Sequence, residues 1–230
     1  MLVSGLQFGD DVFVAARPKI IPIKDASSFS WNDVTKEERF DKMDTTEALE
    51  KVLYEKIKTS AWAKLAPRHV YEENPFPEGR YYEEISTIGN FVLSVDSVVE
   101  SNAEIYGYVM RPGSIVHRKS ATMDQVEDYF YAIKTLLDIS QRHHVNQAAI
   151  AFHRCLQLAR VHSLLRVTDD KLQSHRIDAV LVASVRDSFS LVKNDRHVTQ
   201  VSKIRFSLLV RAPHLYDTLF SLYEKLKKGI

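Results

Sequence analysis

The stretch Thr122–His162, TMDQVEDYFYAIKTLLDISQRHHVNQAAIAFHRCLQLARVH, contains two segments whose apolar residues recur at helical spacing. Thr122 and Gln125 have the spacing of a capping box, in which two residues satisfy free backbone N–H groups at the start of a helix. The second segment runs from about His144 to Leu164. The sequence therefore predicts two successive helices. The apolar residues of the first follow the i, i+3, i+4 rule: Val126, Tyr129, Phe130, Ile133, Leu136 and Leu137.

The second predicted helix is rich in residue types that bind metals. On a helical wheel Cys155 lies on the apolar face and His153 on the polar face, nearly half a turn away. His144 and His162 share one side of the wheel, but 18 residues separate them. Along a helix that separation is ~27 Å, whereas the ligands of one zinc ion converge at ~2 Å. We therefore expect no metal site and no other cofactor, with Cys155 buried as a small apolar residue.

The polar side of this helix forms the first candidate binding site. It combines histidine, glutamine and arginine with the apolar Ile150 and Val161, a mixture found on contact surfaces. We expect this side to face an anionic ligand such as nucleic acid or an acidic membrane, and a solvated stripe is the alternative. Its candidate residues are Gln147, His153, Arg154, Gln157 and Arg160.

Two other places carry cations that suit phosphate contact. Arg118 and Lys119 follow a Pro-Gly turn, and an ordinary exposed hairpin loop is the alternative there. Lys203 and Arg205 alternate with apolar residues, so a strand at Gln200–Pro213 would place both on one basic face of a sheet. We include all four residues in the candidate contact surface.

The order of the remaining elements predicts the fold class. A capped helix is expected from Asp44 toward Pro67, and Pro213 can begin a last helix. The order α, ββ, αα, ββ, α predicts an α+β fold with an antiparallel or mixed sheet of about four strands packed by about four helices. An irregular N-terminal arm with one short strand near Lys19–Ile23 precedes these elements. The four main strands are expected at Ile85–Ser101, Ala103–Ser114, Arg176–Asp187 and Gln200–Pro213.

Charge divides the chain of 230 residues into two parts. Residues 1–100 hold 12 Lys and Arg against 18 Asp and Glu, whereas residues 101–230 hold 19 against 12. We predict an acidic part at residues 1–70, a Pro-rich connection at 71–84 and a basic α+β body at 85–230. Such a division is typical of two parts that meet different partners, and chance surface charge together with contact between the two parts is the alternative.

Several classes are disfavoured by what the sequence lacks. A single cysteine forms no internal disulfide framework, and no run approaches ~18 apolar residues. No secretory leader is evident at the N-terminus, and neither of the common glycine-rich nucleotide loops occurs. These observations predict a cytoplasmic or nuclear protein that is not secreted and has no transmembrane segment.

Three functions remain as hypotheses. The first is a non-enzymatic scaffold that forms homo-oligomers and binds nucleic acid or an acidic membrane, as a viral matrix-type or nucleocapsid-associated protein would. The second is an enzyme acting on phosphate esters through His117 or His153, because histidine suits acid–base work near neutral pH. The third is an adaptor that binds only proteins, through residues 1–100 and the segment Tyr71–Glu84.

Overall fold

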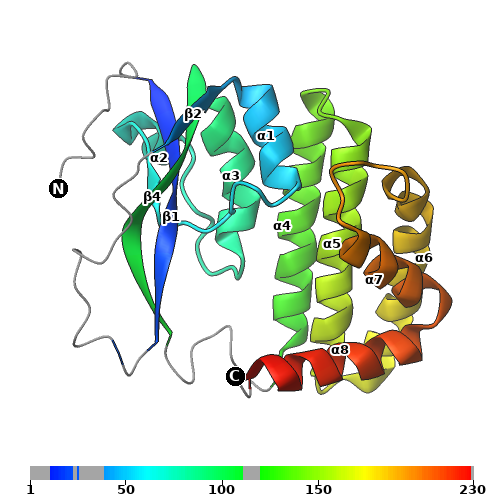
Figure 1. Cartoon of the computed structure of the whole chain (residues 1–230). Helices are drawn as coiled ribbons and strands as arrows, with labels where there is room; N and C mark the ends of the chain where they lie inside the picture. The colour runs from blue at the N-terminus through cyan, green and yellow to red at the C-terminus, as the bar shows by residue number, and fades with distance from the viewer. Residues whose placement is uncertain (1–10, 23–24, 26–38, 111–119, 229–230) are drawn as a thin grey trace.

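A mixed sheet stands beside a bundle of helices in the computed structural model, which describes residues 11–22, 25, 39–110 and 120–228 (Figure 1). These residues form eight helices and four strands, so the predicted α+β class is confirmed. The strands are β1 (Val12–Pro22), β2 (Phe40–Met43), β3 (Lys64–Leu65) and β4 (Ser97–Met110). The helices are α1 (Thr45–Leu53), α2 (Arg68–Glu73), α3 (Glu83–Leu93), α4 (Met123–Arg142), α5 (Gln147–Leu165), α6 (Lys171–Val192), α7 (Gln200–Arg211) and α8 (Pro213–Lys228).

The sheet has the order β2-β4-β1-β3, with β1 and β4 at its centre. These two strands run parallel, and their register extends from the pair Val12 and Ser97 to the pair Pro22 and Met110. β2 pairs antiparallel with β4, and β3 pairs antiparallel with β1. The strand predicted near Lys19–Ile23 is therefore the end of β1, which belongs to the centre of the sheet.

The predicted hairpin of Ile85–Ser101 and Ala103–Ser114 is wrong. Its first half forms helix α3, and the residues from Ser97 to Met110 form one long strand. The physical reason is that the buried residues of α3 recur at helical spacing. Those residues include Ile85, Ile88, Gly89 and Val92. The prediction relied instead on the alternation of apolar and polar residues near the C-terminal end of this segment.

Gly89 brings α3 close to α4. A Cβ atom at this position would lie 3.1 Å from Leu136 Cδ1 and 3.3 Å from two carbons of Ile139. The absence of a side chain therefore lets the two helices approach closely, and α1 and α3 lie between the sheet and the pair α4 and α5 (Figure 1).

Helices α1 and α4 begin at the capping residues that the sequence predicts. Asp44 accepts a hydrogen bond of 2.8 Å from the backbone N–H of Glu47 at the start of α1. The capping box of Thr122 and Gln125 is complete at the start of α4. Helix α1 ends at Leu53, earlier than expected, and the predicted helices over α5 and α8 are confirmed.

Helices also form where the sequence indicated the second strand pair, so the strands at Arg176–Asp187 and Gln200–Pro213 are wrong. The side chains of Asp170 and Thr199 cap these helices by accepting from Gln173 N and Ser202 N. Tertiary packing selects the helix here, because one face of each helix is buried against α5 and the neighbouring helix. The buried residues of α6 include Leu181, Val185, Ser188 and Val192, and those of α7 are Phe206 and Leu209.

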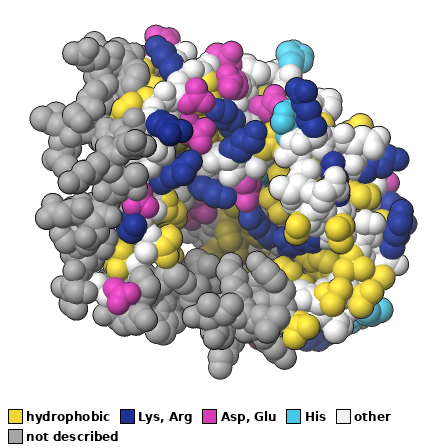
Figure 2. Space-filling view, in the orientation of Figure 1, with side chains coloured by type: hydrophobic (Ala, Val, Ile, Leu, Met, Phe, Trp, Pro, Cys, Tyr) yellow, Lys and Arg dark blue, Asp and Glu magenta, His cyan; other side chains and the backbone are white. Residues whose placement is uncertain are grey.

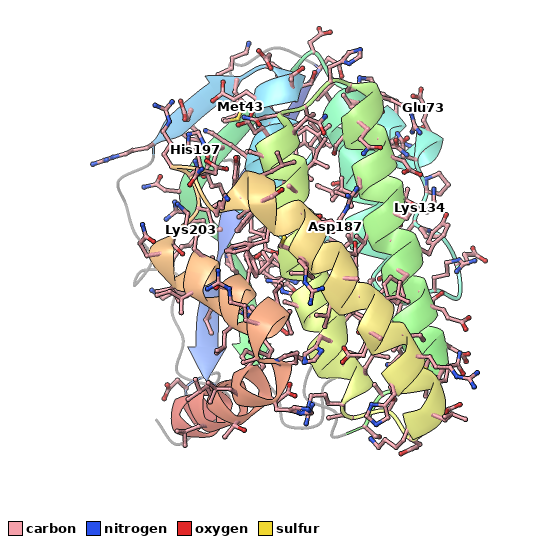
Figure 3. The ribbon with its side chains drawn as sticks, turned by 90° about the vertical axis from the view of Figure 1, so that its right-hand side faces the viewer. Met43, Glu73, Lys134, Asp187, His197 and Lys203 are labelled. Atoms are coloured by element: carbon pink, nitrogen blue, oxygen red, sulfur yellow. The ribbon has the colours of Figure 1, made fainter. Side chains whose placement is uncertain are left out.

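Helix α5 is the centre of the helical half. It packs against α4, α6, α1 and α7, and most of its residues are buried on every side (Figures 1 and 3). Cys155 is buried in this core, as predicted, and burial raises the pKa of its thiol to about 12. Among the described residues, no helix has the length and apolar character needed to span a membrane.

Candidate functional site

The predicted contact residues are scattered by the fold. Arg118 and Lys119, with the neighbouring His117, lie outside the described residues. Gln147 is exposed at the first turn of α5, after the cap formed by Asn146. The other candidates on α5 and α7 face different surroundings, so the seven described candidates do not form one surface.

His153 lies in the core, and the prediction that it is exposed is wrong. The side chain has no accessible surface, because α1 covers the side of α5 that was expected to face solvent. Its Nδ1 lies 3.1 Å from the carbonyl oxygen of Leu53, while its buried Nε2 has no partner. Burial lowers the pKa of His153 to about 4. The imidazole is therefore neutral at pH 7 and does not reach a substrate, which removes it from the enzyme hypothesis.

Gln157 and Arg160 belong to a partly buried polar network that also contains Tyr129 and Glu55. Tyr129 donates to Gln157 Oε1 at 2.8 Å, and Gln157 Nε2 donates to Glu55 Oε1 at 3.2 Å. Arg160 donates to both carboxylate oxygens of Glu55, with Nη2 at 2.8 Å from Oε2. These side chains satisfy one another, so the predicted exposed stripe is an internal link between α5 and the end of α1.

Glu55 is the member of this network that the sequence did not reveal. It lies two residues beyond Leu53, the last residue of α1, in a left-handed backbone conformation with φ of 55° that does not continue the helix. Burial by itself would raise the pKa of the Glu55 carboxyl, but hydrogen bonds and charge from Arg160 outweigh it and lower the pKa. Positive φ in a residue other than glycine is uncommon and gives no clear sequence signal.

Lys203 and Arg205 lie on helix α7, so the predicted basic face of a sheet does not exist. Arg205 donates to the hydroxyl of Tyr216 at 3.0 and 2.9 Å, and its guanidinium lies 4.9 Å from the ring centre of Phe220. Arg205 therefore attaches α7 to α8. Lys203 is half-buried on the same helix, near the exposed His197 (Figure 3).

A second buried charge cluster centres on His162. Its Nδ1 lies 2.5 Å from an oxygen of Asp178 on α6, and its Nε2 lies 2.8 Å from an oxygen of Asp217 on α8. Arg166 also donates to Asp217. Burial would lower the pKa of His162, but the hydrogen bonds and charges of Asp178 and Asp217 raise it.

The geometry around His162 indicates a structural role, because the ring on α5 links α6 to α8 through Asp178 and Asp217. Both ring nitrogens face carboxylates, so the protonated ring donates to both and keeps no lone pair for use as a base. A cavity of about 380 Å³ borders the cluster, with the exposed His175 and His214 in its lining. Within the described ranges no group of His, Cys, Asp and Glu has the arrangement of a metal site.

Exposed aliphatic side chains gather on the three C-terminal helices. Of the thirteen large exposed hydrophobic residues among the described residues, eight lie on α6, α7 or α8. Figure 2 shows hydrophobic side chains gathered over α7 and α8. Three of the eight lie along α6, and we call the five residues on α7 and α8 the C-terminal apolar surface: Val201, Ile204, Leu215, Leu219 and Leu222.

Cations accompany this surface. Three acidic side chains nearby are engaged, because Asp178 and Asp217 contact His162, and Asp195 accepts from Tyr54 and the backbone N–H of His197. Asp187 on α6 is exposed. Over helices α6 and α7 and the turn between them, several exposed cations have no ion-pair partner in the described part of the chain. They are Arg176, Lys193, Arg196 and Arg211.

The sequence matches no protein-family model and no curated protein. The partly buried network, the His162 cluster and the exposed C-terminal helices are therefore the features from which a function has to be inferred.

Proposed function

We propose that the protein is a non-enzymatic scaffold that self-associates and binds an anionic surface through its C-terminal helices. The observation that carries this proposal is the C-terminal apolar surface, together with the unpaired cations beside it. Large exposed apolar patches on soluble proteins mark contacts with other proteins or with membranes. The neighbouring cations add attraction for an acidic partner, with each Lys or Arg near an acidic membrane contributing about 1 kcal/mol.

An acidic membrane suits these side chains better than nucleic acid does. The exposed residues of the C-terminal apolar surface are aliphatic, and aliphatic side chains enter the interface between lipid headgroups and acyl chains. Nucleic-acid platforms stack bases on exposed aromatic rings. The aromatic residues Phe206 and Tyr216 are instead buried on α7 and α8. A viral matrix-type protein, which self-associates on a membrane, is a concrete form of this proposal.

Vesicle sedimentation tests the proposal directly. The full chain is mixed with vesicles of neutral lipid, or of neutral lipid with phosphatidylserine, at several salt concentrations. We expect binding only to the acidic vesicles, with affinity that falls as salt rises because screening weakens the attraction. Binding that is equal on both vesicles or indifferent to salt contradicts the proposal, and tighter binding to RNA than to acidic vesicles contradicts the choice of partner.

A matched pair of charge variants locates the binding surface. The triple variant Lys193→Glu, Arg196→Glu and Arg211→Glu should weaken binding to acidic vesicles at least tenfold. The control variant Lys42→Glu, Lys56→Glu and Arg142→Glu makes the same change in net charge at exposed positions elsewhere. It should change binding less than threefold. Equal losses in the two variants would show that overall charge, and no particular surface, determines binding.

Self-association is tested by the solution mass before and after nuclease treatment. We expect a mass above that of one chain, and we expect it to persist after nuclease because protein contacts hold the copies together. A mass of one chain at all concentrations contradicts this part of the proposal. The predicted adaptor role of residues 1–100 remains a separate prediction, which a pull-down with that fragment can check.

A further inference from the structure

An open groove of about 520 Å³ runs between α4 and α6, with α5 as its floor. Arg154 is the one predicted contact residue that lines it. The groove is mainly apolar, and its walls carry aliphatic and aromatic side chains at helical spacing. They include Phe130, Ile133 and Leu137 from α4, Ile177 and Val180 from α6, and Leu158 from α5.

The groove has the length of two helical turns. Its α4 wall extends from Phe130 to Asp138 and its α6 wall from Arg176 to Ser184. Eight residues along either helix correspond to ~12 Å at ~1.5 Å per residue. Figure 3 shows α4 and α6 on this side of the molecule, where Lys134 marks the α4 wall. The described structure therefore presents an apolar trough whose long side is open to solvent.

Unpaired positive charge lies at this groove. Lys134 and Asp138 form an ion pair with each other along α4. Arg154 is half-buried and Arg176 is exposed, and neither has an ion-pair partner among the described residues. A ligand that combines an apolar stripe with nearby carboxylates would therefore complement the groove in both polarity and charge.

We propose that this groove binds an amphipathic helix of a partner protein, with acidic residues beside its apolar stripe. Apolar anchors at i, i+4 and i+7 span about two turns, as the groove does, and helix-in-groove recognition uses this spacing. The outer face of such a helix stays in water and is polar. An acyl chain in the same open trough would keep methylene groups exposed to water, which is unfavourable because apolar surface gains free energy only where it is buried.

A second copy of this chain fits the groove less well. Helix α8 offers exposed Leu215, Leu219 and Leu222 at the required spacing. However, the sequence of α8 contains three lysines, Lys225, Lys227 and Lys228, against Asp217 and Glu224, and Asp217 is already engaged by His162 and Arg166. Charge therefore favours an acidic partner helix over α8. Arg176 lies at both proposed sites, but the three cations changed in the vesicle test do not line the groove, so failure of either proposal leaves the other standing.

Fluorescence anisotropy with labelled peptides tests the inference on the full chain. The first peptide is a designed helix with leucines at i, i+4 and i+7 and glutamates beside them. The second has the same leucines with lysines in place of the glutamates, and the third is a scrambled acidic sequence. We expect the acidic helix to bind at least tenfold more tightly than either of the others. Equal binding of the three peptides, or no binding, overturns the inference.

Charge reversal in the groove makes the test specific. Arg154→Glu combined with Arg176→Glu should weaken the acidic peptide at least tenfold and strengthen the lysine peptide. Arg176→Glu alone keeps the proposal testable if the double variant does not fold, because Arg176 is exposed. Arg142→Glu, an exposed change beyond the groove, should leave both affinities within twofold. Competition by a fatty acid but by no peptide would overturn the proposal in favour of a lipid ligand.

Discussion

Arg160 on α5 donates to both carboxylate oxygens of Glu55, which lies 105 residues earlier in the chain. Gln157 contacts both partners, so the pair is held within a wider network. The geometry is the bidentate one that favours arginine over lysine. This contact fixes the end of α1 against the central helix, and with it the layer between the sheet and the bundle.

Removing the arginine should therefore destabilise the protein. We expect Arg160→Met to lower the free energy of unfolding by about 2 kcal/mol, because Glu55 is left partly buried without its main donor. Urea denaturation at pH 7 measures this loss. Lys58 also approaches Glu55, at 3.9 Å, but from an exposed position. Lys58→Met should cost no more than about 0.5 kcal/mol, and similar losses in the two variants would contradict the role of Arg160.

His162 should make stability fall at alkaline pH. The folded protein holds its pKa above the ordinary value, so its contribution is fully present below about pH 6.5. That contribution is lost as pH rises through the raised pKa. At pH 6 we expect His162→Gln to be less stable by about 3 kcal/mol, because two carboxylates lose their shared donor. The gap from the unsubstituted protein should narrow toward pH 9.

Urea denaturation at several pH values measures this dependence. His175→Gln is the matched control, since His175 lines the same cavity but is exposed. It should change stability little at any pH. A gap for His162→Gln that stays constant from pH 6 to pH 9 would show that the imidazole acts through packing alone.

His153 should make the stability of the protein fall at acidic pH, whereas His162 makes it fall at alkaline pH. Its folded pKa of about 4 lies below the ordinary 6.5, because burial opposes the charge. Protons therefore bind the unfolded chain more readily, and stability falls as pH drops from 6.5 toward 4. The full effect is roughly 3 kcal/mol for a shift of this size. His153→Gln should show a flatter dependence over this window, and an unchanged slope would refute the assignment.

The two faces of α8 should respond differently to substitution. Tyr216 is buried and accepts from Arg205, so Tyr216→Ala should cost about 3 kcal/mol in unfolding experiments. Leu215 and Leu219 are 50% and 47% exposed. Changing both leucines to serine should cost less than about 1 kcal/mol and should reduce self-association in sedimentation experiments. Unchanged association would exclude this stripe from the contact between copies.

Short-range sequence signals correctly predicted where two helices begin. The capping box at Thr122 and the cap at Asp44 place helix starts correctly, because both depend on residues three positions apart. The segments that form α6 and α7 have the same kind of caps at Asp170 and Thr199. Their β-branched and leucine-rich composition suggested strands, and packing against α5 decided in favour of helices.

The candidate site was less predictable because its contacts are distant in sequence. A helical wheel separates polar from apolar residues, but it does not show that α1 covers the polar side of α5. His153 and Gln157 are buried for that reason, and Glu55 carries no motif. Of the candidates on α5, Gln147 is exposed at the first turn, and Arg154 lies where α4 and α6 leave α5 uncovered.

The parallel pairing of β1 with β4 determines when the sheet can form. β1 ends at Pro22, and the ribosome must make about seventy-five more residues before Ser97 begins its central neighbour. Loop closure over such a distance costs entropy before the contacts between the strands offset it, and this slows folding. During synthesis β1 is therefore made well before β4, and its backbone N–H and C=O groups lack their main partner over that interval. Chaperone binding to the nascent chain would cover this unpaired strand.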